Sequence, residues 1–95
     1  MPKAYWIAHV TVTNPDQYKF YASDAGITFK KYAATILARG GPHQQMEGQG
    51  HARNVVIEFP SLQAAIACYN SEEYQSAKAK RKDAGEADIV IVEGV

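Results

Sequence analysis

The sequence lacks several features that would place the protein in a specialised class. It has a single cysteine, Cys68, so no intramolecular disulfide can form, which is typical of a reducing compartment. Its 10 Lys and Arg residues balance its 10 Asp and Glu residues, so no net charge attracts nucleic acid or an anionic membrane. No run approaches the ~20 apolar residues that would cross a bilayer, and the amino terminus lacks the features of a secretion signal. We therefore expect a cytoplasmic protein with no nucleic-acid or membrane partner.

What the chain contains is sufficient for one small domain over residues 1–95. Its hydrophobic content is 46%, and a domain of this size leaves a large share of its surface uncovered. The chain is centred on residues 54–71, which read NVVIEFPSLQAAIACYNS. Val55 to Ile57 are apolar on both faces, which predicts a central strand. Pro60 ends that strand, and Ser61 can cap a helix that begins at Leu62.

Two elements precede this unit. Ala4 to Val12 alternates as a strand does, with one mostly apolar face and one face that carries His9. Asn14 followed by a proline is a strong helix start. The helix presents one face, which should pack on the sheet and consists of Tyr18, Tyr21, Ala22, Ala25 and Phe29.

A long hairpin and a second helical region complete the pattern. Thr35 to Arg39 predicts a strand that Gly40-Gly41 interrupts by a bulge or bend, with a continuation over residues 43–47 and a turn over residues 48–53. The packing face of the helix from Leu62 to Tyr69 is predicted to hold Leu62, Ala65, Ile66 and Tyr69. A second helical piece, capped within residues 70–74, runs to about Ala84, and the last strand covers Asp88 to Glu93.

The order strand, helix, strand, strand, helix, strand predicts an α+β fold. With right-handed crossovers it gives a four-stranded antiparallel sheet with the helices on one face, the ferredoxin-like βαββαβ arrangement. The strands Val55 to Ile57 and Ile89 to Val92 are apolar on both faces, so the uncovered face needs a partner. We expect a homodimer formed by sheet-to-sheet packing that buries more than ~1,000 Å².

A family resemblance is carried, in order, by AYWIAHVTVTNPDQY, LARGG, NVVIEFPS, ACYNSEEYQ and ADIVIVEG. Over nearly the whole chain these stretches resemble the small bacterial proteins of domain-of-unknown-function family 1330, which belong with the dimeric α/β-barrel proteins. The resemblance implies the same fold and dimer. It also implies a pocket between sheet and helices, because the wider group includes cofactor-independent monooxygenases, isomerases and haem-degrading proteins. The immediate family has no assigned reaction.

The chain departs from the family pattern just before the second strand. Ala33-Ala34 stands where we expect glycine in the family pattern. We therefore expect a less bent backbone there and a different edge to the nearby pocket.

Two side chains are candidates for proton transfer. If the first and third strands are parallel neighbours and Ala4 aligns with Arg53, His9 lies beside Glu58. A carboxylate orients an imidazole and raises its proton affinity, as a general base requires. The alternative is a polar pair that only satisfies itself.

Other residues are candidates for ligand binding. Arg39, beside the double glycine, suits the carboxylate or enolate of a small ligand, although a salt bridge to Glu47 or Glu58 is equally compatible. Aromatic side chains suit a flat apolar ligand or form only packing. They are Trp6, Tyr18, Tyr21, Phe29, Tyr69 and Tyr74.

Metal and cofactor chemistry is not indicated. His9, His43 and His51 lack the spacing of a metal site, and the glycines of residues 48–50 precede a strand and not a helix, so they offer phosphate no helix start. Cys68 has no basic neighbour in sequence and is interpreted as inert packing. Two hypotheses remain. One is a cofactor-independent oxygenase- or isomerase-like enzyme acting on a small aromatic or carboxylated metabolite; the other is a non-catalytic, homodimeric ligand-binding or structural module.

Overall fold

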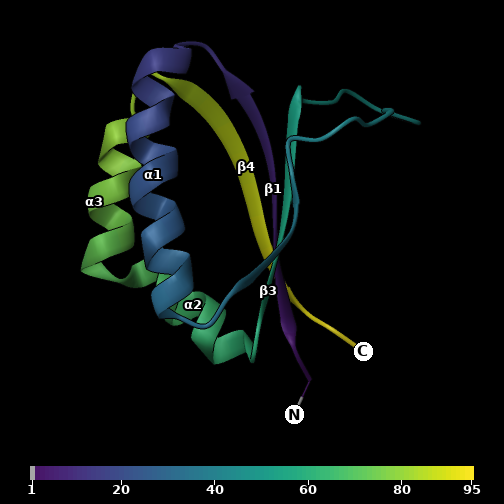
Figure 1. Cartoon of the computed structure of the whole chain (residues 1–95). Helices are drawn as coiled ribbons and strands as arrows, with labels where there is room; N and C mark the ends of the chain where they lie inside the picture. Colours follow the sequence, from purple (N-terminus) through teal and green to yellow (C-terminus); the bar gives the residue numbers. More distant parts are fainter. Residues whose placement is uncertain (1) are drawn as a thin grey trace.

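The computed structural model describes residues 2–95, which form four strands and three helices. The strands make one antiparallel sheet in the order β2-β3-β1-β4. All three helices cover the same face of this sheet, and the other face is open (Figure 1). The predicted α+β, ferredoxin-like arrangement is confirmed. The elements are β1 (Ala4–Val12), α1 (Pro15–Lys31), β2 (Thr35–Arg39), β3 (Arg53–Phe59), α2 (Leu62–Asn70), α3 (Glu72–Arg81) and β4 (Gly85–Glu93).

Side-chain caps start each helix where the sequence indicates. The Asn14 side chain accepts a hydrogen bond from the Gln17 amide at 3.2 Å, and Ser61 accepts one from the Ala64 amide at 3.1 Å. Ser71 separates α2 from α3, because its hydroxyl donates to the Cys68 carbonyl at 2.7 Å and accepts from the Tyr74 amide at 3.1 Å. These bonds satisfy backbone groups that a helix end leaves unpaired.

The hairpin between β2 and β3 differs from the prediction in two ways. The bulge lies between Ile36 and Ala38, ahead of the double glycine. Residues 43–47, predicted to continue the strand, form no strand. The pairing ends where the Gly40 amide donates to the Asn54 carbonyl at 2.9 Å, and β3 begins at Arg53, so the residues beyond have no partner strand. They belong to a loop that extends away from the helices (Figure 1).

The turn before β2 also differs from the expectation. Ala33 has a φ of 60°, which is the left-handed conformation that glycine favours. The backbone therefore bends sharply at this position although the residue is alanine. The expectation of a less bent chain was wrong, because three backbone hydrogen bonds close the end of α1 around this residue: Tyr32 and Ala34 both bond to the Phe29 carbonyl, and Ala33 bonds to the Lys30 carbonyl.

Trp6 is the centre of the core between the sheet and the helices. Its ring lies 5.1 Å from that of Phe29, 5.0 Å from that of Tyr74 and 5.5 Å from that of Tyr69, measured between centroids. The predicted aromatic face of α1 is confirmed, since Tyr18, Tyr21, Ala25 and Phe29 are all buried. On α2 the prediction was partly wrong: Ile66 is 44% exposed, and Ala65 and Cys68 are the buried residues.

The open face of the sheet carries an apolar strip over β1 and the edge strand β4. Val90 is 54% exposed and Val92 is 46% exposed, and they lie opposite Ile7 and Tyr5 in the β1–β4 ladder. The chain is a slab with extents of 37 × 33 × 17 Å. Its accessible surface of 6213 Å² exceeds the roughly 5,400 Å² expected for a compact monomer of 10.4 kDa. Within residues 2–95, none of the helices has the length and apolar character to span a bilayer.

Candidate functional site

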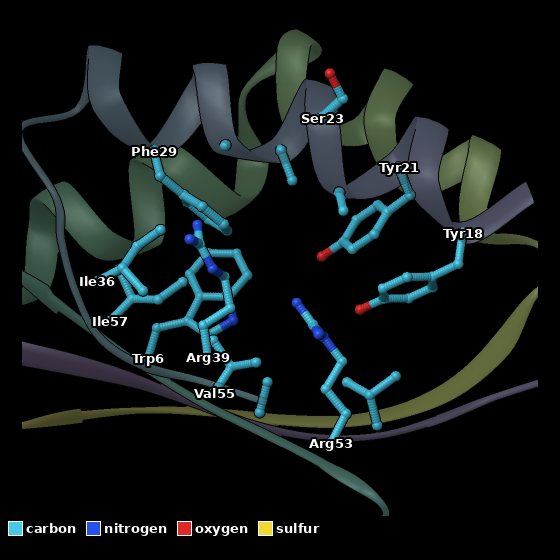
Figure 2. Close-up of a pocket in the computed structure, with 15 residues that line it drawn as sticks. Trp6, Tyr18, Tyr21, Ser23, Phe29, Ile36, Arg39, Arg53, Val55 and Ile57 are labelled. Carbon is cyan, nitrogen blue, oxygen red and sulfur yellow. The ribbon is translucent and has the colours of Figure 1, made fainter. Parts of the chain in front are cut away.

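A cavity of about 310 Å³ lies between α1 and the covered face of the sheet. Strand alternation places its floor: Trp6, Ala8 and Val10 of β1 face the helices, as do Val55 and Ile57 of β3. The wall is the aromatic face of α1, with Phe29 at one end and Tyr18 and Tyr21 at the other (Figure 2). The cavity is therefore mostly apolar, and few polar groups can orient a ligand in it.

Two arginines enter this cavity from the sheet. Arg39 ends β2 and pairs with Val55 of β3, while Arg53 is two residues before Val55 on the same strand. Because side chains two apart in a strand share a face, both guanidinium groups project toward α1 (Figure 2). Among residues 2–95, none that lines the cavity is an aspartate or a glutamate. In this part of the chain, the polar side of the cavity therefore carries positive charge that no carboxylate balances.

Arg53 is the less satisfied of the two. Its guanidinium carbon lies 5.6 Å from the centre of the Tyr18 ring, a cation–π contact. Its Nε is the buried side-chain nitrogen or oxygen that lacks a hydrogen-bond partner within residues 2–95. A buried donor without a partner costs ~1–3 kcal/mol, so the position of Arg53 beneath α1 is costly to the fold.

Glycine at position 40 makes room for Arg53. A Cβ at Gly40 would lie 2.7 Å from an Nη atom of Arg53, and the φ of Gly40 is +65°. Any other residue would meet the guanidinium and also occupy a strained backbone conformation. The first residue of the double glycine, which was predicted to allow a close approach beside Arg39, thus makes room for Arg53.

Arg39 does not form either of the salt bridges that the sequence left open. Glu58 instead accepts from Lys3 at 3.1 Å and from the Tyr5 hydroxyl at 3.3 Å. Among residues 2–95 no ion pair joins Arg39 to Glu47 or Glu58. The Arg39 side chain remains available at the mouth of the cavity.

The prediction that His9 lies beside Glu58 was wrong. Strands β1 and β3 are antiparallel, so Tyr5 lies opposite Glu58 and His9 lies opposite Asn54. The right-handed crossover through α1 makes β2 parallel to β1, and the hairpin folds β3 back between them, antiparallel to both. His9 and Glu58 are four residues apart along the ladder, ~13 Å. Both are on the open face, and neither lines the cavity.

His9 instead belongs to a polar cluster on the open face. Its Nδ1 is 2.6 Å from Oδ1 of Asn54, and its ring stacks 6.4 Å from that of His51. His51 contacts Thr11 Oγ1 at 2.7 Å and Asp88 Oδ2 at 3.1 Å. In the part of the chain that the structure describes, no three His, Cys, Asp or Glu residues are grouped so that they could hold a metal ion.

The structure brings together five of the seven predicted ligand-binding residues. Those that line the cavity are Arg39, Trp6, Tyr18, Tyr21 and Phe29. Tyr74 lies behind its wall, fully buried, and its hydroxyl contacts that of Tyr21 at 2.9 Å. Tyr69 lines a separate, shallow hollow beside β4. Burial raises the pKa of the Tyr21 phenol above its ordinary value, and Tyr74 adds to the effect. Tyr21 therefore keeps its proton.

Sequence reasoning missed Arg53. The signal was present, because Arg53 alternates with Val55 and Ile57 and must share their covered face. It was interpreted as part of a turn. Cys68, in contrast, was interpreted correctly as packing: it is fully buried, and burial raises the pKa of its thiol to about 12.

Comparison with known families confirms the resemblance seen in the sequence. The family model described as "Domain of unknown function (DUF1330)" matches residues 3–95. No curated protein matches the chain.

Solved structures with a similar fold come from several bacteria. A protein of unknown function from Rhodopseudomonas palustris is 16% identical, with 99% of this chain and 83% of that chain covered and a TM-score of 0.71. SnoaB, a cofactor-independent oxygenase from Streptomyces nogalater, is 9% identical, with 100% and 95% covered and a TM-score of 0.68. A dimeric ferredoxin-like protein of unknown function from Bacteroides fragilis is 12% identical, with 97% and 96% covered and a TM-score of 0.58. Identities this low show a shared fold alone.

Proposed function

The chain belongs to the family of domains of unknown function DUF1330, and from its cavity we propose that it binds a small, flat, anionic metabolite. The ligand class is an aromatic or conjugated ring that carries a carboxylate, phenolate or enolate oxygen. The aromatic wall and apolar floor accept the ring, and the two arginines accept the oxygen. The observation that carries the proposal is the presence of Arg39 and Arg53 in an apolar cavity whose lining, over the described residues 2–95, includes no acidic side chain.

The electrostatics favour an ionised ligand. A guanidinium pairs with a carboxylate or enolate oxygen through charge-assisted hydrogen bonds, which are about twice as strong as neutral ones. In a cavity of low polarity this attraction is less screened than in water. The site therefore lowers the pKa of a bound carbon acid or phenol and increases the share of its anion.

This property supports an oxygenase-like activity as the enzymatic form of the proposal. A conjugated enolate is electron-rich and can react with O₂ directly, so the reaction needs stabilisation of the enolate and no bound cofactor. The structural similarity to SnoaB, a cofactor-independent oxygenase, is in keeping with such a role. A second candidate, ligand binding without turnover, is favoured by the lining itself, because within the described part of the chain it contains no histidine or carboxylate to remove a proton.

The proposal includes a homodimer through the open face of the sheet. The apolar strip on this face is exposed in a single copy, and the accessible surface area of the chain exceeds that of a compact monomer of its mass. In Figure 1 the loop between β2 and β3 projects on the side of this face, and Met46 in the loop is 78% exposed. A second copy seated on the face would cover the strip and meet the loop.

Binding of two matched probes tests the proposed ligand class. We expect 1-naphthoate to bind with higher affinity than neutral 1-naphthalenemethanol, measured by isothermal titration calorimetry at neutral pH. Arg53→Gln should weaken the binding of naphthoate about tenfold or more, because it removes a charge-assisted contact. Lys19→Gln, which removes an exposed positive charge on α1 outside the cavity, is the control and should leave the affinity unchanged. Equal affinity for the two probes would refute the proposal.

Oxygen uptake separates the two candidate functions. The probe is 2-tetralone, a bicyclic ketone whose C1–C2 enolate is conjugated with its benzene ring. Consumption of O₂ that increases with protein concentration and is lost in Arg53→Gln would support the oxygenase. Binding of naphthoate with no acceleration of O₂ uptake would support the binding module.

A further inference from the structure

A chain of hydrogen-bonding groups runs from α3 through the core to the cavity. An Nη atom of Arg81 donates to the Tyr74 hydroxyl at 3.2 Å, and this hydroxyl lies 2.9 Å from that of Tyr21. The guanidinium carbon of Arg81 also lies 4.8 Å from the centre of the Tyr21 ring. Of the three residues only Tyr21 lines the cavity, so Arg81 and Tyr74 can act on a ligand only through it.

We propose that Arg81 and Tyr74 position the Tyr21 hydroxyl as a hydrogen-bond donor into the cavity, where it recognises an anionic oxygen of the ligand together with Arg53. This inference rests on the proposed function and deepens it. It assigns to Tyr21 a binding role, and to Tyr74 and Arg81 the role of positioning residues that select anionic over neutral ligands.

The donors and acceptors available in each side chain decide which group donates in each of these hydrogen bonds. A guanidinium has no acceptor, so Arg81 must donate and the Tyr74 oxygen must accept. Tyr74 has one hydroxyl hydrogen and is fully buried. Its recorded partners within residues 2–95 are Arg81 and Tyr21, so the Tyr21 oxygen is the acceptor available to that hydrogen. The opposite direction would leave a buried hydroxyl hydrogen without an acceptor, at a cost of ~1–3 kcal/mol.

Once Tyr21 accepts from Tyr74, its own hydrogen is free. The Tyr21 hydroxyl points into the cavity, on the side of the Arg53 guanidinium (Figure 2). Because a cation starts the chain, each hydroxyl is polarised in the same sense, which strengthens the terminal donor. An anionic oxygen would meet donors from Tyr21 and Arg53, whereas a neutral hydroxyl gains little from them.

The experiment measures selectivity for the two probes, 1-naphthoate and 1-naphthalenemethanol, by titration calorimetry. We expect Tyr21→Phe to lower the affinity for naphthoate about tenfold and Tyr74→Phe to lower it about three- to tenfold, with the affinity for the neutral probe changed less than about twofold. Tyr32→Phe is the matched control. It removes a phenol hydroxyl at the end of α1 that lies outside the cavity and takes no part in the Arg81–Tyr74–Tyr21 hydrogen bonds. This variant should preserve the selectivity for naphthoate over the neutral probe.

Each outcome is decisive. A parallel loss of affinity for both probes in Tyr74→Phe would mean a role in packing alone and would overturn the inference. Selectivity that survives in Tyr21→Phe would overturn it as well. Equal affinity of the unaltered chain for both probes would refute the proposed function itself, so the two failures are distinguishable. Should Tyr74→Phe not fold, Arg81→Met interrupts the same series of hydrogen bonds at its half-buried end. Its ratio of affinities for the two probes is then the measurement that decides.

Discussion

Tyr5 lies opposite Glu58 across β1 and β3, and its hydroxyl donates to the Glu58 carboxylate at 3.3 Å. Lys3 donates to the same carboxylate at 3.1 Å. Glu58 is thus held by two donors at one end of the open face, and His9 belongs to the polar cluster at the other end. The two residues that the sequence paired for proton transfer have separate surroundings.

This separation predicts that His9 and Glu58 act independently. His9→Gln should leave the affinity for naphthoate unchanged, because the cavity lies on the opposite face of the sheet. The effects of His9→Gln and Glu58→Gln on the free energy of unfolding should add to within ~0.5 kcal/mol in the double variant. Urea denaturation of the four proteins measures this. A larger coupling, or a loss of ligand binding in His9→Gln, would restore the paired role.

Arg53 is predicted to be dispensable for stability. Its buried Nε has no partner, so Arg53→Met removes a costly unpaired donor while the methionine keeps most of the apolar contact. The free energy of unfolding should stay within ~1 kcal/mol of the original value or rise. Arg81→Met is the contrasting variant: it removes a donor from Tyr74 and should lower stability by ~1–2 kcal/mol. A larger fall for Arg53→Met than for Arg81→Met would contradict this assignment.

We predict that replacing Ala33 with glycine stabilises the protein. Its φ of 60° costs an L-residue with a side chain ~1–2 kcal/mol, and glycine avoids that cost while losing more chain entropy on folding. Ala33→Gly should therefore raise the free energy of unfolding by ~0.5–1 kcal/mol. Ala67→Gly, at an exposed position inside α2, should lower it by ~1 kcal/mol. Thermal and urea unfolding would show the opposite signs, and a loss of stability in both variants would disprove the prediction.

The buried thiol of Cys68 leads us to expect slow alkylation and a pH-dependent contribution to stability. Its thiol is fully buried and has a pKa raised from 9.0 to about 12, so it should react with iodoacetamide only when the chain unfolds. The unfolded thiol ionises at a lower pH than the folded one. Its contribution to stability is therefore complete below pH 9.0 and lost as the pH rises to about 12. Cys68→Ala should remove this part of the decline in alkaline stability; rapid alkylation of the folded protein would refute the interpretation.

The open face predicts a defined change of assembly. Val90→Glu places a charge in the apolar strip, where Val90 is 54% exposed in one chain. We expect it to convert a homodimer to a monomer in sedimentation equilibrium, because a buried unpaired charge opposes association. Ile27→Glu is the control, since Ile27 is a 69% exposed residue on α1, on the helical side. A monomeric unaltered chain would refute the homodimer, and equal effects of the two variants would place the interface elsewhere.

Local sequence patterns were sufficient to predict most of the fold. Asn14, Ser61 and Ser71 mark helix starts by bonds that reach only three residues along the chain, so their neighbours in sequence decide them. The alternation of β1 likewise assigned Trp6 to one face and His9 to the other. These features depend on interactions that a short stretch of chain contains.

Local sequence patterns could not predict which residues face each other across the sheet. Whether His9 meets Glu58 or Asn54 depends on strand direction, and β3 takes its direction from the hairpin that inserts it between β1 and β2. The packing of α1 over β3 likewise left Arg53 with an unpaired nitrogen beside Tyr18. By itself the sequence determined which elements form and which of their faces are apolar, because capping and periodicity act over a few residues. Only the tertiary structure decided which polar groups meet in the cavity, because those contacts join residues far apart in the chain.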